Sequence, residues 1–221
     1  MIKSLKELIG TAIIVLMGCG IASTSNTILG TSVNLPGAFT LLTIAIGFAT
    51  SYLIASYIFN KDKCTFNPIL TFSDILLKNK KIKQGLIEII GQVLGGFIGA
   101  EILGIILGQY GSLGANGYGL NSIIGANLAQ AITIEIIISL ILTIVYLKKD
   151  KNKELYIALT IILIYLFAIP YTNASANPAR SIGPAILMGI EYLKQLWVFI
   201  LCPFIGAIIA IIIYKISQKN S

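Results

Sequence analysis

Long apolar stretches separated by short polar segments run along almost the whole chain. An α-helix needs about 20 predominantly apolar residues to cross the roughly 30 Å hydrocarbon core of a bilayer. The stretches that approach or exceed this length predict six transmembrane helices, at residues 8–28, 38–59, 85–108, 123–147, 155–171 and 193–214. The pattern therefore predicts an all-α membrane protein.

The composition strengthens this interpretation and narrows the chemistry. Apolar residues make up 56% of the 221 residues and charged residues only 11%, whereas about a quarter of the residues in a typical soluble domain are charged. The chain contains no histidine, the commonest metal ligand and general base. Its three cysteines, Cys19, Cys64 and Cys202, are too scattered for a disulfide framework. We expect neither an enzyme nor a metal or other cofactor.

The positions of the basic residues predict how the helices are oriented. The predicted topology places segments 29–37 and 109–122 on one side of the membrane, and both are uncharged. Of the 16 basic residues, only Arg180 and Lys194 lie on this same side. Because basic loops stay in the cytoplasm, we expect both termini to be cytoplasmic. The net charge of +7 then reflects membrane topology, and we expect no nucleic-acid partner. The other 14 are Lys3, Lys6, Lys61, Lys63, Lys78, Lys80, Lys81, Lys83, Lys148, Lys149, Lys151, Lys153, Lys215 and Lys219.

The amino terminus has an alternative interpretation as a secretory signal. Lys3 and Lys6 precede an apolar run, and "LMGC" at 16–19 faintly resembles a lipoprotein cleavage site. Removing the first helix would leave the two termini on opposite sides of the membrane. We therefore favour the six-helix topology.

Three features occur twice in the same order and predict an internal duplication. "FIGA" occurs at 97–100 and 204–207, Asn-Pro occurs at 67–68 and 177–178, and each half carries a glutamate in its first predicted helix, Glu7 and Glu135. We expect one channel-like domain, 1–221, with a first repeat at 1–110 and a second at 123–221. Three helices per repeat is an odd number, so the second copy would be inverted relative to the first.

Each Asn-Pro pair is predicted to begin a short helix, since Asn is a strong N-cap and Pro fits the first helical position. The apolar pieces that follow, 68–77 and 178–188, cover only about half the hydrocarbon thickness at 1.5 Å per residue. One follows an inner loop and the other an outer loop. They could therefore meet at their N-termini in mid-membrane, where non-helical backbone is tolerated only beside protein or a water-filled cavity.

These motifs resemble the aquaporin or major intrinsic protein family over nearly the whole chain. The resemblance is carried by "NPARSIGPA" (177–185), "AIPYTNASANPARS" (168–181), "KELIGT" with "GCG" (6–20), "GQVLGG" (91–96) and "PFIGA" (203–207). The first box departs from the family pattern, because Ile69 replaces the usual Ala and Thr65 the usual His. The resemblance implies a passive channel for water in a homotetramer embedded in lipid. Its two pore boxes would be Asn67, Pro68 and Ile69, and Asn177, Pro178 and Ala179.

The resemblance also implies a selectivity filter and two structural carboxylates. The filter would consist of Arg180, Tyr165, Ala174 and Gly47, with Ile46 or Phe48 in place of Gly47 if the register shifts by one. Taken alone, Arg180 could instead extend to the membrane surface, and Tyr165 could be an interfacial aromatic residue. Such a filter could be wider than that of a strict water pore. Glu7 and Glu135 would accept hydrogen bonds from the re-entrant loops.

Alternative functions stay open at this point. The small Gly47 and Ala174 would leave room for glycerol, urea, ammonia or hydrogen peroxide. An ion-coupled transporter would also use inverted repeats and broken helices, with Glu7 or Glu135 as its titratable group. A purely structural or adhesive membrane protein would leave membrane permeability unchanged.

Overall fold

The computed structural model describes residues 2–32, 37–59, 63–148 and 150–219, and in these residues every regular element is helical. Lys61 and Lys149 lie outside the described residues. Within these described ranges, six helices are long and apolar enough to cross a membrane, and the predicted all-α fold is confirmed. The long helices are α1 (Ile2–Ser32), α2 (Gly37–Ile58), α4 (Ile82–Leu107), α5 (Leu128–Leu147), α6 (Lys153–Thr172) and α9 (Leu196–Lys219).

The remaining helices are short. They are α3 (Pro68–Leu76), α7 (Pro178–Met188), α8 (Ile190–Leu193) and the 3₁₀-helix η2 (Gly119–Asn121). The fourth span is predicted to begin at residue 123, but α5 begins five residues later, at Leu128. Asn127 caps the helix: its side-chain oxygen accepts the backbone N–H of Gln130, and the side-chain oxygen of Gln130 accepts the backbone N–H of Asn127.

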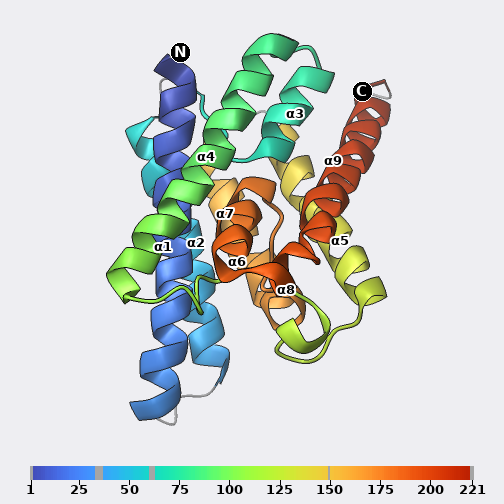
Figure 1. Ribbon diagram of the computed structural model, residues 1–221. Coiled ribbons are helices and arrows are strands. Elements are labelled where there is room, and N and C mark those ends of the chain that lie inside the picture. Colours follow the sequence, from blue (N-terminus) through green and yellow to red (C-terminus); the bar gives the residue numbers. More distant parts are fainter. Residues whose placement is uncertain (1, 33–36, 60–62, 149, 220–221) are drawn as a thin grey trace.

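In Figure 1, α7 lies at the centre of the bundle, and α3 lies between α4 and α9 on the side of the two termini. α1 packs against α2 and α4, and α5 packs in the same way against α6 and α9. α7 packs on α4 and α3 on α9, so each short helix contacts the last long helix of the other half. α1 begins and α9 ends on the same side of the bundle (Figure 1). The inverted repeat stays a prediction, and it would produce a pairing of this kind.

Two glycines allow α7 to approach α4 closely. A side chain on Gly96 would overlap the backbone carbonyl of Ala179, and one on Gly183 would overlap the carbonyl of Gly96. On the other side of the bundle, the rings of Phe72 and Phe204 meet edge to face at 5.1 Å and hold α3 against α9. These contacts position the two short helices relative to each other.

A buried network of charges surrounds the C-terminal end of α3, on the side of the bundle where the two chain termini lie. The side chain of Glu88 is 1% exposed and forms ion pairs with Lys80, whose side chain is 5% exposed, and with Lys3 at 3.4 Å. Lys80 also lies 3.6 Å from Asp74, which accepts a hydrogen bond from the Tyr146 hydroxyl at 2.8 Å. The network links α1, α3, α4 and α5. These lysines therefore do more than signal topology.

Candidate functional site: a narrow cavity between the two half-helices

Asn67 and Asn177 begin α3 and α7 in the same way. Each has extended backbone, and its side-chain oxygen accepts from the backbone N–H two residues later at 3.1 Å, Ile69 in one case and Ala179 in the other. Pro68 and Pro178 occupy the first helical positions. Two helix N-termini, with their partial positive charges, therefore face the same point.

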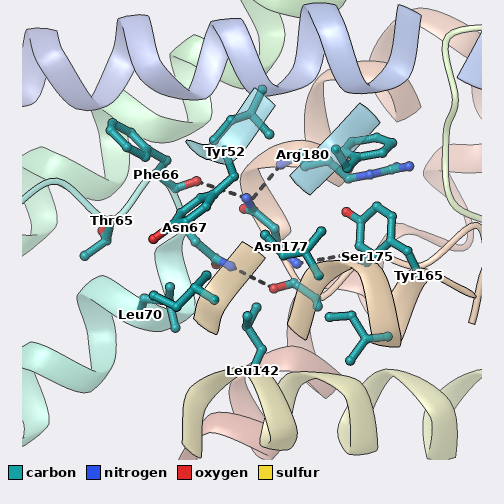
Figure 2. Close-up of a pocket in the computed structure, with 16 residues that line it drawn as sticks. Tyr52, Thr65, Phe66, Asn67, Leu70, Leu142, Tyr165, Ser175, Asn177 and Arg180 are labelled. Carbon is teal, nitrogen blue, oxygen red and sulfur yellow. Dashed lines mark hydrogen bonds between the residues drawn. The ribbon is translucent and has the colours of Figure 1, made fainter. Parts of the chain in front are cut away.

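The two asparagines are also joined across the interface between the half-helices. The Asn67 amide donates to the carbonyl of Ala176 at 2.8 Å, and the Asn177 amide donates to the carbonyl of Phe66 at 2.9 Å (Figure 2). Each amide nitrogen carries two N–H donors. One therefore closes the junction, and the other is available to a molecule in the cavity.

Two buried glutamates hold the loops that lead into the half-helices. Glu7 accepts from the backbone N–H groups of Thr65 and Phe66 at 2.9 and 2.7 Å, and from the Gln92 amide at 2.9 Å. Glu135 accepts from Ser175 and Ala176 at 3.0 and 3.1 Å and from the Thr172 hydroxyl at 2.7 Å. Neither glutamate has any exposed surface.

These hydrogen bonds stabilise an unfavourable backbone conformation. Phe66 and Ala176, the residues before each asparagine, have φ values of 52° and 46°, in the left-handed region that costs residues other than glycine about 1–3 kcal/mol each. Glu7 and Glu135 accept the N–H of these same two residues. The carboxylates therefore fix the turn that presents each asparagine to the cavity.

The cavity beside the asparagines has a volume of about 30 Å³. A cavity needs at least about 10–15 Å³ to hold a water molecule, so this cavity has room for water. Asn67, Asn177, Thr65 and Ser175 supply polar groups to a mainly apolar wall. The other lining residues are Ile14, Phe48, Tyr52, Phe66, Leu70, Leu142, Ile157, Ile161, Ile164, Tyr165, Ala176 and Arg180 (Figure 2).

A second cavity, of about 510 Å³, lies beyond Phe48 and Arg180, toward the uncharged loop that follows α4. Phe48 and Arg180 line both cavities. The two side chains therefore separate a wide vestibule from the narrow inner cavity.

Arg180 is 2% exposed and is fixed by three oxygens. Its guanidinium donates to the carbonyl of Gly114 at 2.7 Å, to the side-chain oxygen of Asn116 at 2.6 Å and to the carbonyl of Asn173 at 3.2 Å. Its Nε has no hydrogen-bond partner among the described residues. The cation is thus held by neutral oxygens and keeps a donor unused.

Aromatic rings complete the boundary between the two cavities. The centre of the Arg180 guanidinium lies 5.1 Å from the centre of the Phe48 ring, within the range of a cation–π interaction. The Phe48 and Tyr165 rings are tilted against each other with centroids 4.7 Å apart. Arg180, Phe48 and Tyr165 therefore form one packed group.

Of the predicted site residues, Asn67, Asn177, Tyr165 and Arg180 line the narrow cavity. On α2 the residue that lines it is Phe48, the alternative register, and not Gly47. Gly47 faces α1, where a side chain would press against Ile21. Phe48 faces the cavity instead, because neighbouring residues on a helix point in different directions. The opening expected from a glycine at this position is filled by a phenyl ring.

Two other predicted residues lie behind the cavity wall. Ala174 and Ile69 have no exposed surface, and neither is among the residues that line the two cavities. Ile69 packs in the hydrophobic core that surrounds the half-helices.

Sequence reasoning missed Tyr52 and Asn116. Tyr52 follows Phe48 by four residues, the spacing of neighbours on one helix face, and that spacing was the available signal. Asn116 lies in an uncharged loop, accepts from Arg180 and Ser181, and donates to the carbonyl of Thr172. Nothing in the local sequence indicates this role.

Comparison with known proteins identifies the family. The family model described as "Major intrinsic protein" matches residues 1–214. Aquaporin Z from Rhodopseudomonas palustris is 31% identical over 233 aligned positions, which cover 99% of this chain and 94% of that protein. Aquaporin Z from Photorhabdus laumondii subsp. laumondii is 31% identical over 230 positions, which cover 97% and 96%.

A solved structure shares the fold. The aquaglyceroporin from Plasmodium falciparum matches with a TM-score of 0.77 at 16% identity, over 96% of this chain and 94% of that chain. At this identity the likeness concerns the fold alone. Since the family model covers almost the entire chain and two relatives exceed 30% identity over nearly their full length, the chain belongs to the major intrinsic protein family of membrane channels.

Proposed function

We propose that this channel conducts water in single file and excludes protons and ions. The observation that carries the proposal is the pair of asparagines that line a narrow cavity with room for water. A water oxygen there can accept an N–H from Asn67 and one from Asn177. Its own hydrogens then point outward along both arms of the pore.

This orientation is the physical basis of proton exclusion. A water molecule whose oxygen is occupied by two amide donors cannot accept a proton from its neighbour and pass it on. The N-termini of α3 and α7 add partial positive charge at the same point, which disfavours hydronium and other cations. Water therefore passes this point and charge does not.

Arg180 is assigned the filter role together with Phe48 and Tyr165. These three side chains lie where the vestibule meets the narrow cavity. A fixed cation repels other cations. The Phe48 and Tyr165 rings limit the width of the filter. A glycine at the position of Phe48 would have left a wider filter that admits glycerol, so the rings favour water over glycerol.

The alternatives have less support. A glycerol or urea facilitator would need a wider path between Phe48 and Tyr165. An ion-coupled transporter would need a titratable group in the path, but Glu7 and Glu135 lie outside the lining of both cavities and bind the re-entrant loops. A purely structural or adhesive protein would not require a buried cation such as Arg180 between two cavities.

The membrane arrangement is part of the proposal. We place the lysine-rich side, with both termini, in the cytoplasm, following the positive-inside rule. Apolar side chains such as Tyr57, Ile105 and Ile106 are exposed on the long helices and fit a surface covered by lipid and by other subunits of a homotetramer.

Reconstitution into liposomes tests the function. Stopped-flow light scattering under impermeant-solute, glycerol and urea gradients measures the three permeabilities separately. We expect water permeability above that of protein-free liposomes and no effect of an uncoupler or a sodium gradient. Uncoupler-sensitive solute accumulation would contradict a passive channel.

A further inference from the structure

We propose that Tyr52 forms a second constriction, inward of Phe48, which restricts the pore to water even when the outer filter is opened. This inference rests on the proposed water-channel function and deepens it. It assigns a specificity role to a residue outside the predicted filter.

The position of Tyr52 follows from the geometry of α2. Tyr52 lies four residues after Phe48, so it is on the same helix face about 6 Å farther along the axis. Both side chains line the narrow cavity, but only Phe48 also lines the vestibule. A molecule that has passed Phe48 therefore meets Tyr52 next.

The Tyr52 ring is held in place. It packs edge to face against Phe66 with centroids 6.5 Å apart (Figure 2), and Tyr52 is only 7% exposed. Phe66 in turn donates its N–H to Glu7, accepts from the Asn177 amide, and packs its ring against α1 where Gly10 leaves space. A ring with such support cannot move aside easily for a larger solute.

Many of the other side chains that line the cavity are aliphatic. Leu142, Ile157 and Ile161 line the cavity together with Leu70, and none of them can hydrogen-bond through its side chain. A triol such as glycerol would give up hydrogen bonds to water here and find few replacements. Water needs only the two asparagine amides, so both size and polarity at this level favour water.

The experiment compares Phe48→Ala with the double variant Phe48→Ala/Tyr52→Val in proteoliposomes. With Tyr52 as a second constriction, Phe48→Ala alone keeps glycerol permeability near the level of protein-free liposomes. The double variant raises it by about tenfold, the discrimination that one or two methylene-sized contacts provide. Equal glycerol permeability of the single and double variants would overturn the proposal, whether both conduct glycerol or both exclude it.

Controls separate ring size, folding and location. Phe48→Ala/Tyr52→Phe keeps the ring and should still exclude glycerol; conduction by this variant would overturn the steric argument. Phe48→Ala/Tyr57→Val changes a tyrosine of the same helix that is 82% exposed and should behave as Phe48→Ala alone. Phe48→Ala/Tyr52→Leu repeats the test should the valine variant be recovered in low yield.

The wild-type protein distinguishes failure of this inference from failure of the function. Wild-type water permeability at the liposome background would contradict the water channel itself. Wild-type water conduction, combined with equal glycerol permeability in the two Phe48 variants, would contradict only the role of Tyr52.

Discussion

The Arg180 guanidinium lies against the Phe48 ring, 5.1 Å from its centre, at the boundary between a vestibule of about 510 Å³ and an inner cavity of about 30 Å³. The two side chains come from opposite halves of the sequence. Phe48 supplies bulk and Arg180 supplies a permanent charge. Together they place the steric and the electrostatic barrier at the same depth.

Arg180→Val is expected to relax the electrostatic barrier. The variant removes the cation and the side chain that fills the space beside Phe48, so the exclusion of charged solutes should weaken. Proton leak, followed with an entrapped pH-sensitive dye, should rise, whereas glycerol should stay excluded by Tyr52 farther along the pore. Lys194→Gln is the control, because this lysine is 65% exposed and pairs only with Glu191 among the described residues. Unchanged selectivity of Arg180→Val would contradict the filter role.

Glu135→Gln is expected to loosen the loop before α7. The Glu135 carboxylate accepts three hydrogen bonds. The amide of a glutamine would place its NH2 group beside these N–H and O–H donors, where it has no acceptor. An unsatisfied buried donor costs about 1–3 kcal/mol. Thermal unfolding in detergent should occur at lower temperature, and water permeability per folded protein should fall.

The matched control for this change is Glu101→Gln. Glu101 accepts a hydrogen bond from the Tyr110 hydroxyl in an exposed position, so its loss should leave both measurements almost unchanged. Equal effects of the two substitutions would show that the loop does not depend on Glu135.

Gly96→Ala tests the contact between α4 and α7. The added carbon would overlap the carbonyl of Ala179, and backbone atoms cannot rotate away as a side chain can. We expect displacement of α7 with the Arg180 it carries, and a loss of water permeability in folded protein. Gly37→Ala, where a side chain meets nothing within 4 Å, should retain wild-type permeability.

Glu88→Gln tests the buried charge network around α3. Among the residues that the structure describes, it leaves Lys80 with only Asp74 as a charged partner, at 3.6 Å. Removing one member of a buried ion pair costs about 3–5 kcal/mol, and this is an upper bound here because Asp74 remains. Glu191→Gln disrupts an exposed pair, and surface changes of this kind stay within about 0.5 kcal/mol. Similar melting temperatures for the two variants would contradict a structural role for Glu88.

The sequence predicted the six long helices because apolar length alone determines what can cross a bilayer. It also predicted where both half-helices begin, since the cap residue and the proline are adjacent in each box. The register of α2 could not be predicted. Every face of that helix is apolar, so the pattern does not indicate whether residue 47 or 48 faces the pore.

Long-range contacts explain the other omissions. Asn116 reaches Arg180 from a loop 64 residues away, and no local motif indicates such a pairing. Lys80 falls in a lysine-rich segment and Glu88 in the predicted third span, and only the packing of α1, α3 and α4 brings the two together and buries them. Tyr52 had a detectable signal in its spacing from Phe48, but an aromatic residue in an apolar helix is usually part of the core.

The most direct test of the account is the osmotic water permeability of the wild-type protein in liposomes, measured by stopped-flow light scattering together with proton flux in the same vesicles. We predict fast shrinkage relative to protein-free liposomes, with proton flux at the background level. Shrinkage at the background rate, or water flux accompanied by proton flux, would contradict a column of water oriented by Asn67 and Asn177.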